Sequence, residues 1–416
     1  MAEIAEARDE LVATTRRLVA IPSPNPPGDV GPVADAAAAL LEAIDGVTLE
    51  RFETAPGIVN LVARITGAAG PGRRIVLNGH LDTFPLGDES GWTVPPFGGL
   101  LREGRLYGRG VSDMKAGIAA SIIAARVLAG HRGAWWGELV VTLAGDEENM
   151  GSLGTRWLLE NVPHARGDAM LCGDVGSPLV VRFGEKGLVW VRIEAVGSPA
   201  HGAHVHKGTN AIDRLRAALD VLKAVENLPI DAPEEVRVAI AAARDVSEPL
   251  SGAGEADTLR RPTVNIGLIA GGSSPNLVPA QAFAEADIRL PVGLTTSAVE
   301  SFLAHELGRL PGIAYEVFRR YEPTFTSPGH EIIRRVTSAG ETVQGRSPVP
   351  NMRVGASDAR LYRLFDVPSA VFGPTPFNMG APDEHILVDE LVVVAQVHAL
   401  TAFEYLSADP DELKSW

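Results

Sequence analysis

Residues 73–82 have the sequence RRIVLNGHLD, and this stretch decides the fold class. The β-branched and aliphatic run RRIVLNG predicts a buried strand, and His80 and Asp82 follow at its carboxyl end. Two later stretches repeat the pattern: ELVVTLAGDEE at 138–148 ends in three acids, and AMLCGDVG at 169–176 contains Asp174. Each stretch therefore predicts a strand that delivers polar side chains at its end.

A helical stretch separates the first two of these strands. Residues 111–130, VSDMKAGIAASIIAARVLAG, begin with polar residues and continue with small and aliphatic ones, which is typical of a buried helix. Strands that alternate with helices predict an α/β domain with a mixed, mostly parallel sheet. Ligands of such sheets bind beyond the carboxyl ends of the strands, so we expect the histidine and the acids to meet there.

The middle of the chain has a different pattern. Between residues 187 and 321, strand-like runs and two helical runs follow the order β-α-β-β-α-β, which predicts a small α+β sheet of the ferredoxin-like type. A chain of 416 residues is also longer than one hydrophobic core usually supports. We therefore expect a catalytic domain made of residues 1–186 and 322–416, with residues 187–321 inserted as a second domain.

Composition excludes several classes of partner. The chain has 37 basic and 52 acidic residues and no basic block, so nucleic acid and anionic membranes are poor partners. Its single cysteine, Cys172, excludes an internal disulfide framework. The amino terminus lacks the apolar core of a signal peptide, and the longest apolar stretch, 116–130, is too short to span a bilayer. We expect a soluble cytoplasmic protein.

Several residues at the predicted strand ends have both a functional and an ordinary interpretation. His80 and Asp82 leave a strand on the same face, so the carboxylate can accept the second N–H of the imidazole, although a His-x-Asp pair is common without function. Asp113 lies where an aspartate could simply cap a helix. Asp174 could be a turn residue, and Glu147 and Glu148 could belong to a solvated loop.

One explanation covers all of these residues. A histidine with several carboxylates is the ligand set that suits a divalent cation such as Zn²⁺, Mn²⁺ or Co²⁺. Four of the acids (Asp113, Glu147, Glu148 and Asp174) cannot all be buried in ionised form in one pocket unless positive charge accompanies them. We take this as an indication of more than one cation.

The strings NGHLDTFP (78–85), GRGVSDMKAG (108–117), AGDEENMGSLGT (144–155) and CGDVG (172–176) resemble, in order and spacing, those of a metallohydrolase family. The family includes succinyl-diaminopimelate desuccinylase, acetylornithine deacetylase, aminoacylase-1 and the glutamate carboxypeptidases. The resemblance extends over essentially the whole chain, and it implies the same fold, with the inserted domain acting as a lid and as the dimerisation domain.

The resemblance also implies roles for individual residues. The implied metal ligands are His80, Asp113, Glu148 and Asp174. Asp113 would bridge two ions, Asp82 would orient His80, and Glu147 would be the general base that takes a proton from the attacking water and passes it to the leaving nitrogen. A cation lowers the pKa of a bound water from about 15.7 to roughly 7, which leaves a carboxylate able to finish the deprotonation.

Three lid residues also match the family. His201 resembles the histidine that reaches the active site of the neighbouring subunit and stabilises the oxyanion, so a homodimer formed through the lid is implied; the alternative is a surface histidine. Asn276 and Arg289 match residues that contact substrate. Arg289 could instead be a structural ion-pair partner of an acid such as Asp287.

The chain departs from the family near its end. Relatives carry a metal-binding histidine four residues before a glutamate, but the string NMGAPDEHILVDE (378–390) has Gly380 at that position. His385 is the nearest candidate ligand. It could reach the second metal through a rearranged loop, or it could be a packed residue, in which case the second site is weak or the enzyme uses a single ion.

These observations lead to one main hypothesis and two alternatives. We expect a metal-dependent hydrolase, with one or two divalent cations per subunit (Zn²⁺ first, then Mn²⁺ or Co²⁺), that cleaves the amide bond of a small N-acyl amino acid or peptide-like substrate. The first alternative is hydrolysis of a non-peptide C–N bond in a carbamoyl compound, an amidine or an activated aromatic amine. The second is a catalytically silent binding protein, against which the clustered acids argue.

Overall fold

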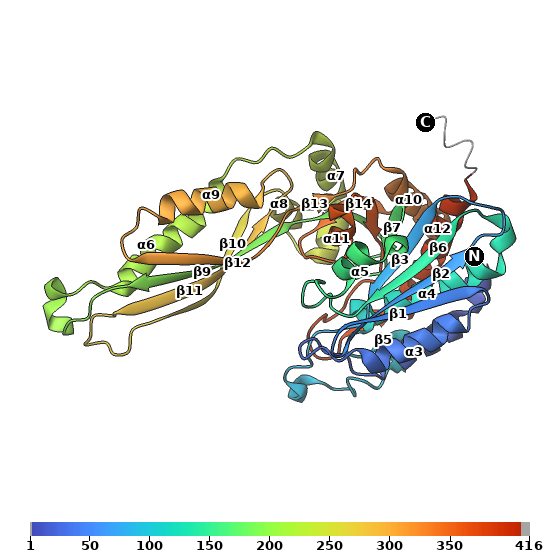
Figure 1. The fold of residues 1–416 in the computed structure, drawn as a ribbon, viewed down its shortest axis with the longest axis horizontal. Coiled ribbons are helices and arrows are strands. Elements are labelled where there is room, and N and C mark those ends of the chain that lie inside the picture. The colour runs from blue at the N-terminus through green and yellow to red at the C-terminus, as the bar shows by residue number, and fades with distance from the viewer. Residues whose placement is uncertain (1, 409–416) are drawn as a thin grey trace.

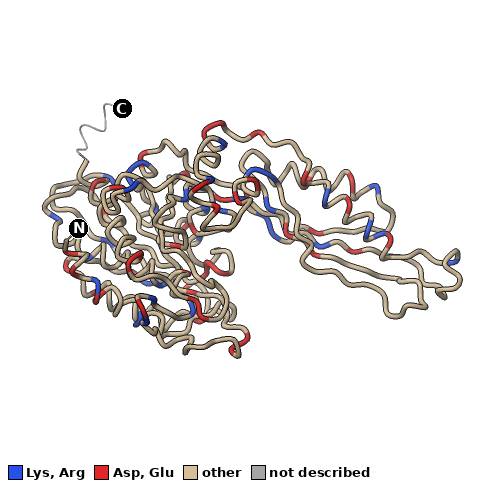
Figure 2. The backbone as a smooth tube through the Cα atoms, turned by 180° about the vertical axis from the view of Figure 1, so that it is seen from behind, with Lys and Arg blue, Asp and Glu red and all other residues tan. Residues whose placement is uncertain are grey.

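The computed structural model describes residues 2–408 and has two bodies (Figure 1). The larger body is built on a nine-stranded sheet, and the smaller one on a four-stranded sheet. Basic and acidic residues are interspersed along the backbone of both bodies (Figure 2). Among the described residues, no helix is both long enough and apolar enough to cross a membrane.

The centre of the large sheet is parallel. Strand β3 (Arg74–His80) lies between β6 (Glu138–Ala144) and β7 (Ala169–Cys172) and is parallel to both. The sheet order is β1-β2-β6-β3-β7-β15-β8-β13, with β14 paired to β8. The remaining strands are β1 (Val47–Ala55), β2 (Ile58–Thr66), β8 (Val180–Glu185), β13 (Thr324–Phe325), β14 (Val349–Arg353) and β15 (Ser369–Val371). Toward the edges of this sheet the strands pair in antiparallel fashion, as β1 and β2 do.

Helices cover both faces of this sheet because the side chains of a strand alternate between faces. Ile75 and Leu77 of β3 pack into one core, and Val76 between them packs into another. The first core is covered by α1 (Ala2–Glu6), α2 (Arg8–Val19), α3 (Gly31–Glu42), α4 (Ala116–Gly130), α10 (Glu331–Gln344) and α12 (Val388–Ser407). The second core is covered by α5 (Thr155–Asn161) and α11 (Ala359–Leu364).

The smaller body is an antiparallel sheet with two helices on one face. Its strands lie in the order β10-β11-β9-β12, and the bounds are β9 (Gly187–Val196), β10 (Thr263–Gly271), β11 (Gln281–Leu290) and β12 (Ile313–Tyr321). Helices α6 (Ala211–Ala224) and α9 (Thr296–Leu307) contribute leucines and a valine to the core of this smaller body. The predicted fold class, a mostly parallel α/β sheet with an inserted ferredoxin-like lid, is confirmed. We call β9–β12 with α6 and α9 the lid.

Two helices that the sequence did not predict lie between α6 and β10. Residues of α7 (Glu234–Ser251) and α8 (Glu255–Leu259) join the core of the larger body, although both helices fall within the expected insert of residues 187–321. Glu255 accepts an ion-pair hydrogen bond from buried Arg182 of β8 at 3.2 Å. The domain limits drawn from the sequence therefore stay a prediction.

A three-stranded sheet connects distant parts of the larger body. Strand β5 (Arg105–Tyr107) pairs with β4 (Leu100–Arg102) on one side and with β16 (His385–Leu387) on the other. This pairing places the segment with Gly380 and His385 beside the loop that leads into α4. The register sets His385 directly opposite Tyr107.

One buried histidine of the core predicts how stability depends on pH. His398 of α12 donates from Nε2 to the carbonyl of Phe372 at 2.8 Å, and burial lowers its pKa to about 4 from the ordinary 6.5. Above 6.5 the imidazole is neutral in both states. As the pH falls from 6.5 toward 4, the unfolded chain takes up a proton that the folded chain does not, so stability is lost in that window.

Between about pH 7.5 and pH 5, the free energy of unfolding of the metal-free wild-type protein should fall by about 2 kcal/mol more than that of His398→Gln. Urea unfolding at the two pH values measures this difference. The exposed histidine variant His305→Gln should keep the wild-type pH dependence. Equal slopes for wild type and His398→Gln would show that His398 does not contribute.

Candidate metal centre

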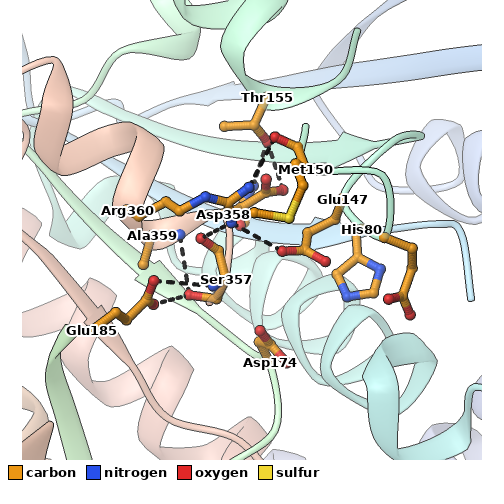
Figure 3. Close-up of polar contacts among 12 residues, drawn as sticks. His80, Glu147, Met150, Thr155, Asp174, Glu185, Ser357, Asp358, Ala359 and Arg360 are labelled. Atoms are coloured by element: carbon orange, nitrogen blue, oxygen red, sulfur yellow. Dashed lines mark hydrogen bonds and ion pairs between the residues drawn. The ribbon is translucent and has the colours of Figure 1, made fainter. Parts of the chain in front are cut away.

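The parallel strands bring their polar ends together at one edge of the large sheet. His80 is the last residue of β3, Asp146 to Glu148 follow β6, and Asp174 follows β7. Because β3 pairs with both neighbours in parallel, these residues open onto the same side (Figure 3). This is the place where the sheet topology predicted a site.

Three donor groups converge on one point. One ligand atom each from His80, Asp113 and Glu148 lies within 4.8 Å of the other two. His80 Nε2 lies 2.9 Å from Asp113 Oδ1, and His80 Nδ1 lies 2.9 Å from the backbone carbonyl of Asp82. With Nδ1–H donated to that carbonyl, Nε2 is free to act as a ligand.

The charge state of the group favours a cation. Burial alone would lower the pKa of His80, but hydrogen bonds to Asp113 and Asp82 raise it well above its ordinary value. Burial, with repulsion from Asp113, raises the pKa of Glu148 to about 11. Glu148 Oε1 is also buried without a hydrogen-bond partner. An unpartnered carboxylate oxygen beside a histidine and a second carboxylate is what a divalent cation would satisfy, so these residues fit one.

Asp113 does not cap the helix that follows it. Its backbone is extended (φ −121°, ψ 92°), and α4 begins only at Ala116 without a side-chain cap. The side chain is free to turn to His80 instead. Burial opposes ionisation here, yet the hydrogen bond and charge of His80 lower the pKa of Asp113.

Asp82 supports the site from behind. Its carboxylate accepts hydrogen bonds from Asn25 Nδ2 at 2.9 Å, from Glu147 N at 3.1 Å and from Glu148 N at 3.0 Å. It therefore fixes the turn that carries the two glutamates. The contact to His80 runs mainly through the Asp82 backbone, because the distance from His80 Nδ1 to Asp82 Oδ1 is 3.4 Å.

Replacing Asp82 with Asn is expected to weaken metal binding by about 10–100-fold, which is typical when a residue that orients a ligand is lost. The amide loses the charge and keeps only one acceptor oxygen for the two backbone N–H groups. Competition with a chromophoric chelator measures the affinity. Asp45→Asn, on the surface beside Arg132, is the control and should bind as wild type does.

Two arginines, Arg360 buried and Arg353 largely buried, hold two further acids of the site, and the sequence did not identify them. Arg360 Nη1 lies 3.1 Å from Glu147 Oε1, and Arg353 Nη1 lies 2.9 Å from Asp174 Oδ2. Burial raises the pKa of Glu147 to about 8, and the charges of His80 and Arg360 oppose that rise. Figure 3 shows Glu147 between Arg360 and His80.

No local pattern marks these arginines in the sequence. Arg360 lies 213 positions from Glu147, and Arg353 lies 179 positions from Asp174. Arg360 lies in the string GASDARLY (355–362), and nothing in that string indicates a contact with Glu147. Pairing of β14 with β8 brings Arg353 to the site, and α11 carries Arg360.

His385 lies outside the converging group. Its ring stacks on Phe377 at 5.0 Å with planes 10° apart and packs against Tyr107 at 4.8 Å. His385 Nδ1 lies 2.9 Å from the carbonyl of Asp383. The structure thus places this residue in an aromatic stack formed by the β5–β16 pairing, which matches the packed alternative considered from the sequence.

Gly380 is held by its backbone. It has a φ of 73°, and a Cβ built there would meet no atom within 4 Å. Its carbonyl accepts from Arg109 Nη2 at 3.1 Å, and Arg109 is in turn ion-paired to Glu384 at 2.5 Å. Glu384 also accepts from Ser112 N and Oγ, next to Asp113. This buried ion pair ties the glycine loop to the metal-binding loop.

The lid residues do not join the group in this chain. His201 Nδ1 accepts from Ala203 N at 3.1 Å, and Gly202 N donates to the carbonyl of Asn276 at 2.7 Å. The loop of residues 198–208 lies at the end of the lid remote from the large sheet (Figure 1). Arg289 Nε pairs with Asp287 at 2.9 Å, the structural partner considered from the sequence.

Comparisons with known sequences match most of this chain. The sequence profile of peptidase family M20/M25/M40 matches residues 76–404. Over 397 residues the chain is 30% identical to the succinyl-diaminopimelate desuccinylase of Rhodospirillum centenum. The match covers 93% of this chain and 95% of the relative.

Solved structures show the same fold. The M20 family metallo-carboxypeptidase Sso-CP2 of Sulfolobus solfataricus matches with a TM-score of 0.78 and 20% identity, over 95% of this chain and 99% of that chain. The YXEP protein of Bacillus subtilis, described as a dinuclear metal-binding peptidase of the M20 family, matches with a TM-score of 0.68 and 16% identity, over 97% and 99%.

Proposed function

Because this chain belongs to peptidase family M20/M25/M40, as its motifs predicted, it is a metal-binding hydrolase of amide bonds, and we propose a particular substrate class and catalytic base for it. The proposed substrate is a small N-acyl amino acid or a similar peptide-like compound. The observation that carries the proposal is the convergence of His80, Asp113 and Glu148 beside Glu147.

A divalent cation held by His80, Asp113 and Glu148 would supply an activated water and would polarise the carbonyl of the scissile bond. Glu147 takes the proton from the attacking water and delivers it to the leaving nitrogen. Arg360 fixes the Glu147 carboxylate at 3.1 Å, and Asp82 fixes the Glu147 backbone at 3.1 Å. The base is therefore held at both ends, which supports productive geometry. Zn²⁺ is the proposed ion, since the donors are one imidazole and carboxylates.

His201 is proposed to act in the site of a second copy. Its loop lies at the remote end of the lid, and its Nδ1 accepts a backbone N–H. A neutral His201 then carries its proton on Nε2, the tautomer that can donate to a developing oxyanion. We propose a homodimer through the lid for this reason. A protein that sediments as a monomer in analytical ultracentrifugation and keeps full activity in the assay would contradict this proposal.

The function is tested by removing the metal and refilling the site. Chelation should abolish turnover of N-acyl amino acids or dipeptides, and Zn²⁺, Mn²⁺ or Co²⁺, added separately, should restore it to different extents. Turnover that survives complete chelation would overturn the proposal. Activity on carbamoyl compounds alone, from the same panel, would move the assignment to hydrolysis of a non-peptide C–N bond.

A further inference from the structure

The metal-binding group is accompanied by positive charge that belongs to the protein. Arg353 and Arg360 contact Asp174 and Glu147 through their Nη1 atoms, and their side chains are only 14% and 3% exposed. A carboxylate is costly to bury without a partner, and each guanidinium removes that cost for one acid. Strand β14, which pairs with β8 and packs under α7, carries Arg353 to this place.

Arginines pair with two of the four acids that the sequence assigned to the pocket. Asp113, Glu147, Glu148 and Asp174 contribute four negative charges, and the two arginines contribute two positive charges. Asp113 and Glu148 are thus the two of these four acids without a guanidinium partner, and both belong to the converging group.

Two further acids beside the pocket have donors of their own. Asp82 accepts from an amide and two backbone N–H groups, and Asp358 accepts from Thr155 Oγ1 at 2.7 Å. Asp82 therefore needs no cation to satisfy its oxygens. Asp358 Oδ1 is buried without a hydrogen-bond partner, as Glu148 Oε1 is, but Asp358 does not belong to the converging group. Asp174 has a partner of its own as well, because its carboxylate accepts a hydrogen bond from Arg353.

The histidines of the chain provide one imidazole ligand. All ten lie among the described residues, and only His80 belongs to the converging group. Gly380 has no side chain, and His385 is stacked between Phe377 and Tyr107. The other eight lie elsewhere, on the surface, in the lid, at the start of α10 or in the core: His131, His164, His201, His204, His206, His305, His330 and His398.

We propose that this chain holds a single divalent cation, at His80, Asp113 and Glu148, and that the Arg353 guanidinium stands in for a second cation by neutralising Asp174. The inference rests on the proposed function, in that both require a cation at this group. A single ion differs from the description of the Bacillus subtilis YXEP protein as a dinuclear metal-binding peptidase. Arg353 is a positioning residue here, since it acts through Asp174.

Metal stoichiometry tests the proposal directly. Wild-type protein is stripped, loaded with excess Zn²⁺, desalted and measured by plasma mass spectrometry, and we expect one equivalent per chain. Arg353→Met frees Asp174 and should allow a second equivalent to bind. Arg353→Lys keeps the charge and should stay at one. Arg363→Met, a buried arginine that pairs with Glu185 rather than with Asp174, is the matched control and should also stay at one.

The outcomes separate the two proposals. No retained metal in wild-type protein would overturn the proposed function itself. Two equivalents in wild-type protein, or equal stoichiometry in Arg353→Met and Arg353→Lys, would overturn the single-ion inference and leave the function intact. Should Arg353→Met fail to fold, electron paramagnetic resonance of the Mn²⁺-loaded wild type decides: isolated ions support the inference, and a spin-coupled pair contradicts it.

Discussion

Glu147→Gln is expected to lower kcat by about 10²- to 10⁴-fold, the range that a positioned general base contributes, while the metal content stays at the wild-type value. Glutamine keeps an oxygen that can accept from Arg360 Nη1, so the loss isolates proton transfer from positioning. Steady-state kinetics on the best substrate of the panel, together with metal analysis of the same preparation, measures both quantities.

The same variant should not destabilise the fold. Burial raises the pKa of Glu147 to about 8, which shows that its charged form is disfavoured in the folded protein. A neutral amide removes that cost, keeps an acceptor for Arg360 and takes away the counter-charge of this buried guanidinium, so the thermal midpoint of the metal-free protein should stay close to the wild-type value. Glu160→Gln, on the surface beside Arg156, is the control for both measurements. A Glu147→Gln enzyme with wild-type kcat would remove this residue from the base role.

The parallel sheet and its active edge were predictable because the signal is local. In β3, β6 and β7 an apolar run ends in polar residues, and parallel pairing brings such ends together without further information. The lid could be recognised for a similar reason: β9, β11 and β12 alternate between buried and more exposed residues, and each helix has an apolar face. The resemblance to the family then supplied the role of this insert as a lid and the roles of individual residues.

Features that depend on distant pairing could not be predicted. Helices α7 and α8 have ordinary amphipathic sequences, and nothing in them indicates that they leave the lid and pack against β14 and β8. The buried arginines are similar, since only the pairing of β14 with β8 brings Arg353 to Asp174. The charge argument for several cations was incomplete for this reason: it counted the acids and had no means of counting guanidinium groups from other elements.

Arg109→Met is expected to destabilise the protein by about 3–5 kcal/mol, the usual cost when one partner of a buried ion pair is removed. Arg109 and Glu384 are each about 1% exposed and lie 2.5 Å apart. Burial already raises the pKa of Glu384, and Ser112 and Arg109 oppose that rise. Without Arg109 the carboxylate is buried with only the Ser112 donors. Urea unfolding of the metal-free protein measures the loss.

The stability lost in Arg109→Met should depend on pH in a definite direction. In Arg109→Met the folded-state pKa of Glu384 should rise further above its unfolded value, so the folded protein takes up a proton first as the pH falls. The deficit relative to wild type is therefore largest at high pH and shrinks as the pH falls through the raised pKa. A deficit that is constant with pH would indicate lost packing rather than an unpaired charge.

A second substitution separates the unpaired charge from the lost contact. In Arg109→Met combined with Glu384→Gln, the amide oxygen still accepts from Ser112 and no charge is left behind, so the double variant should be more stable than Arg109→Met alone. Exposed Arg102→Met should change stability by no more than about 0.5 kcal/mol. Because Arg109 also holds the carbonyl of Gly380 and, through Glu384, the residue before Asp113, both Arg109 variants should bind the cation more weakly. Wild-type metal affinity in the double variant would show that the Gly380 loop and the metal-binding loop are positioned independently of this ion pair.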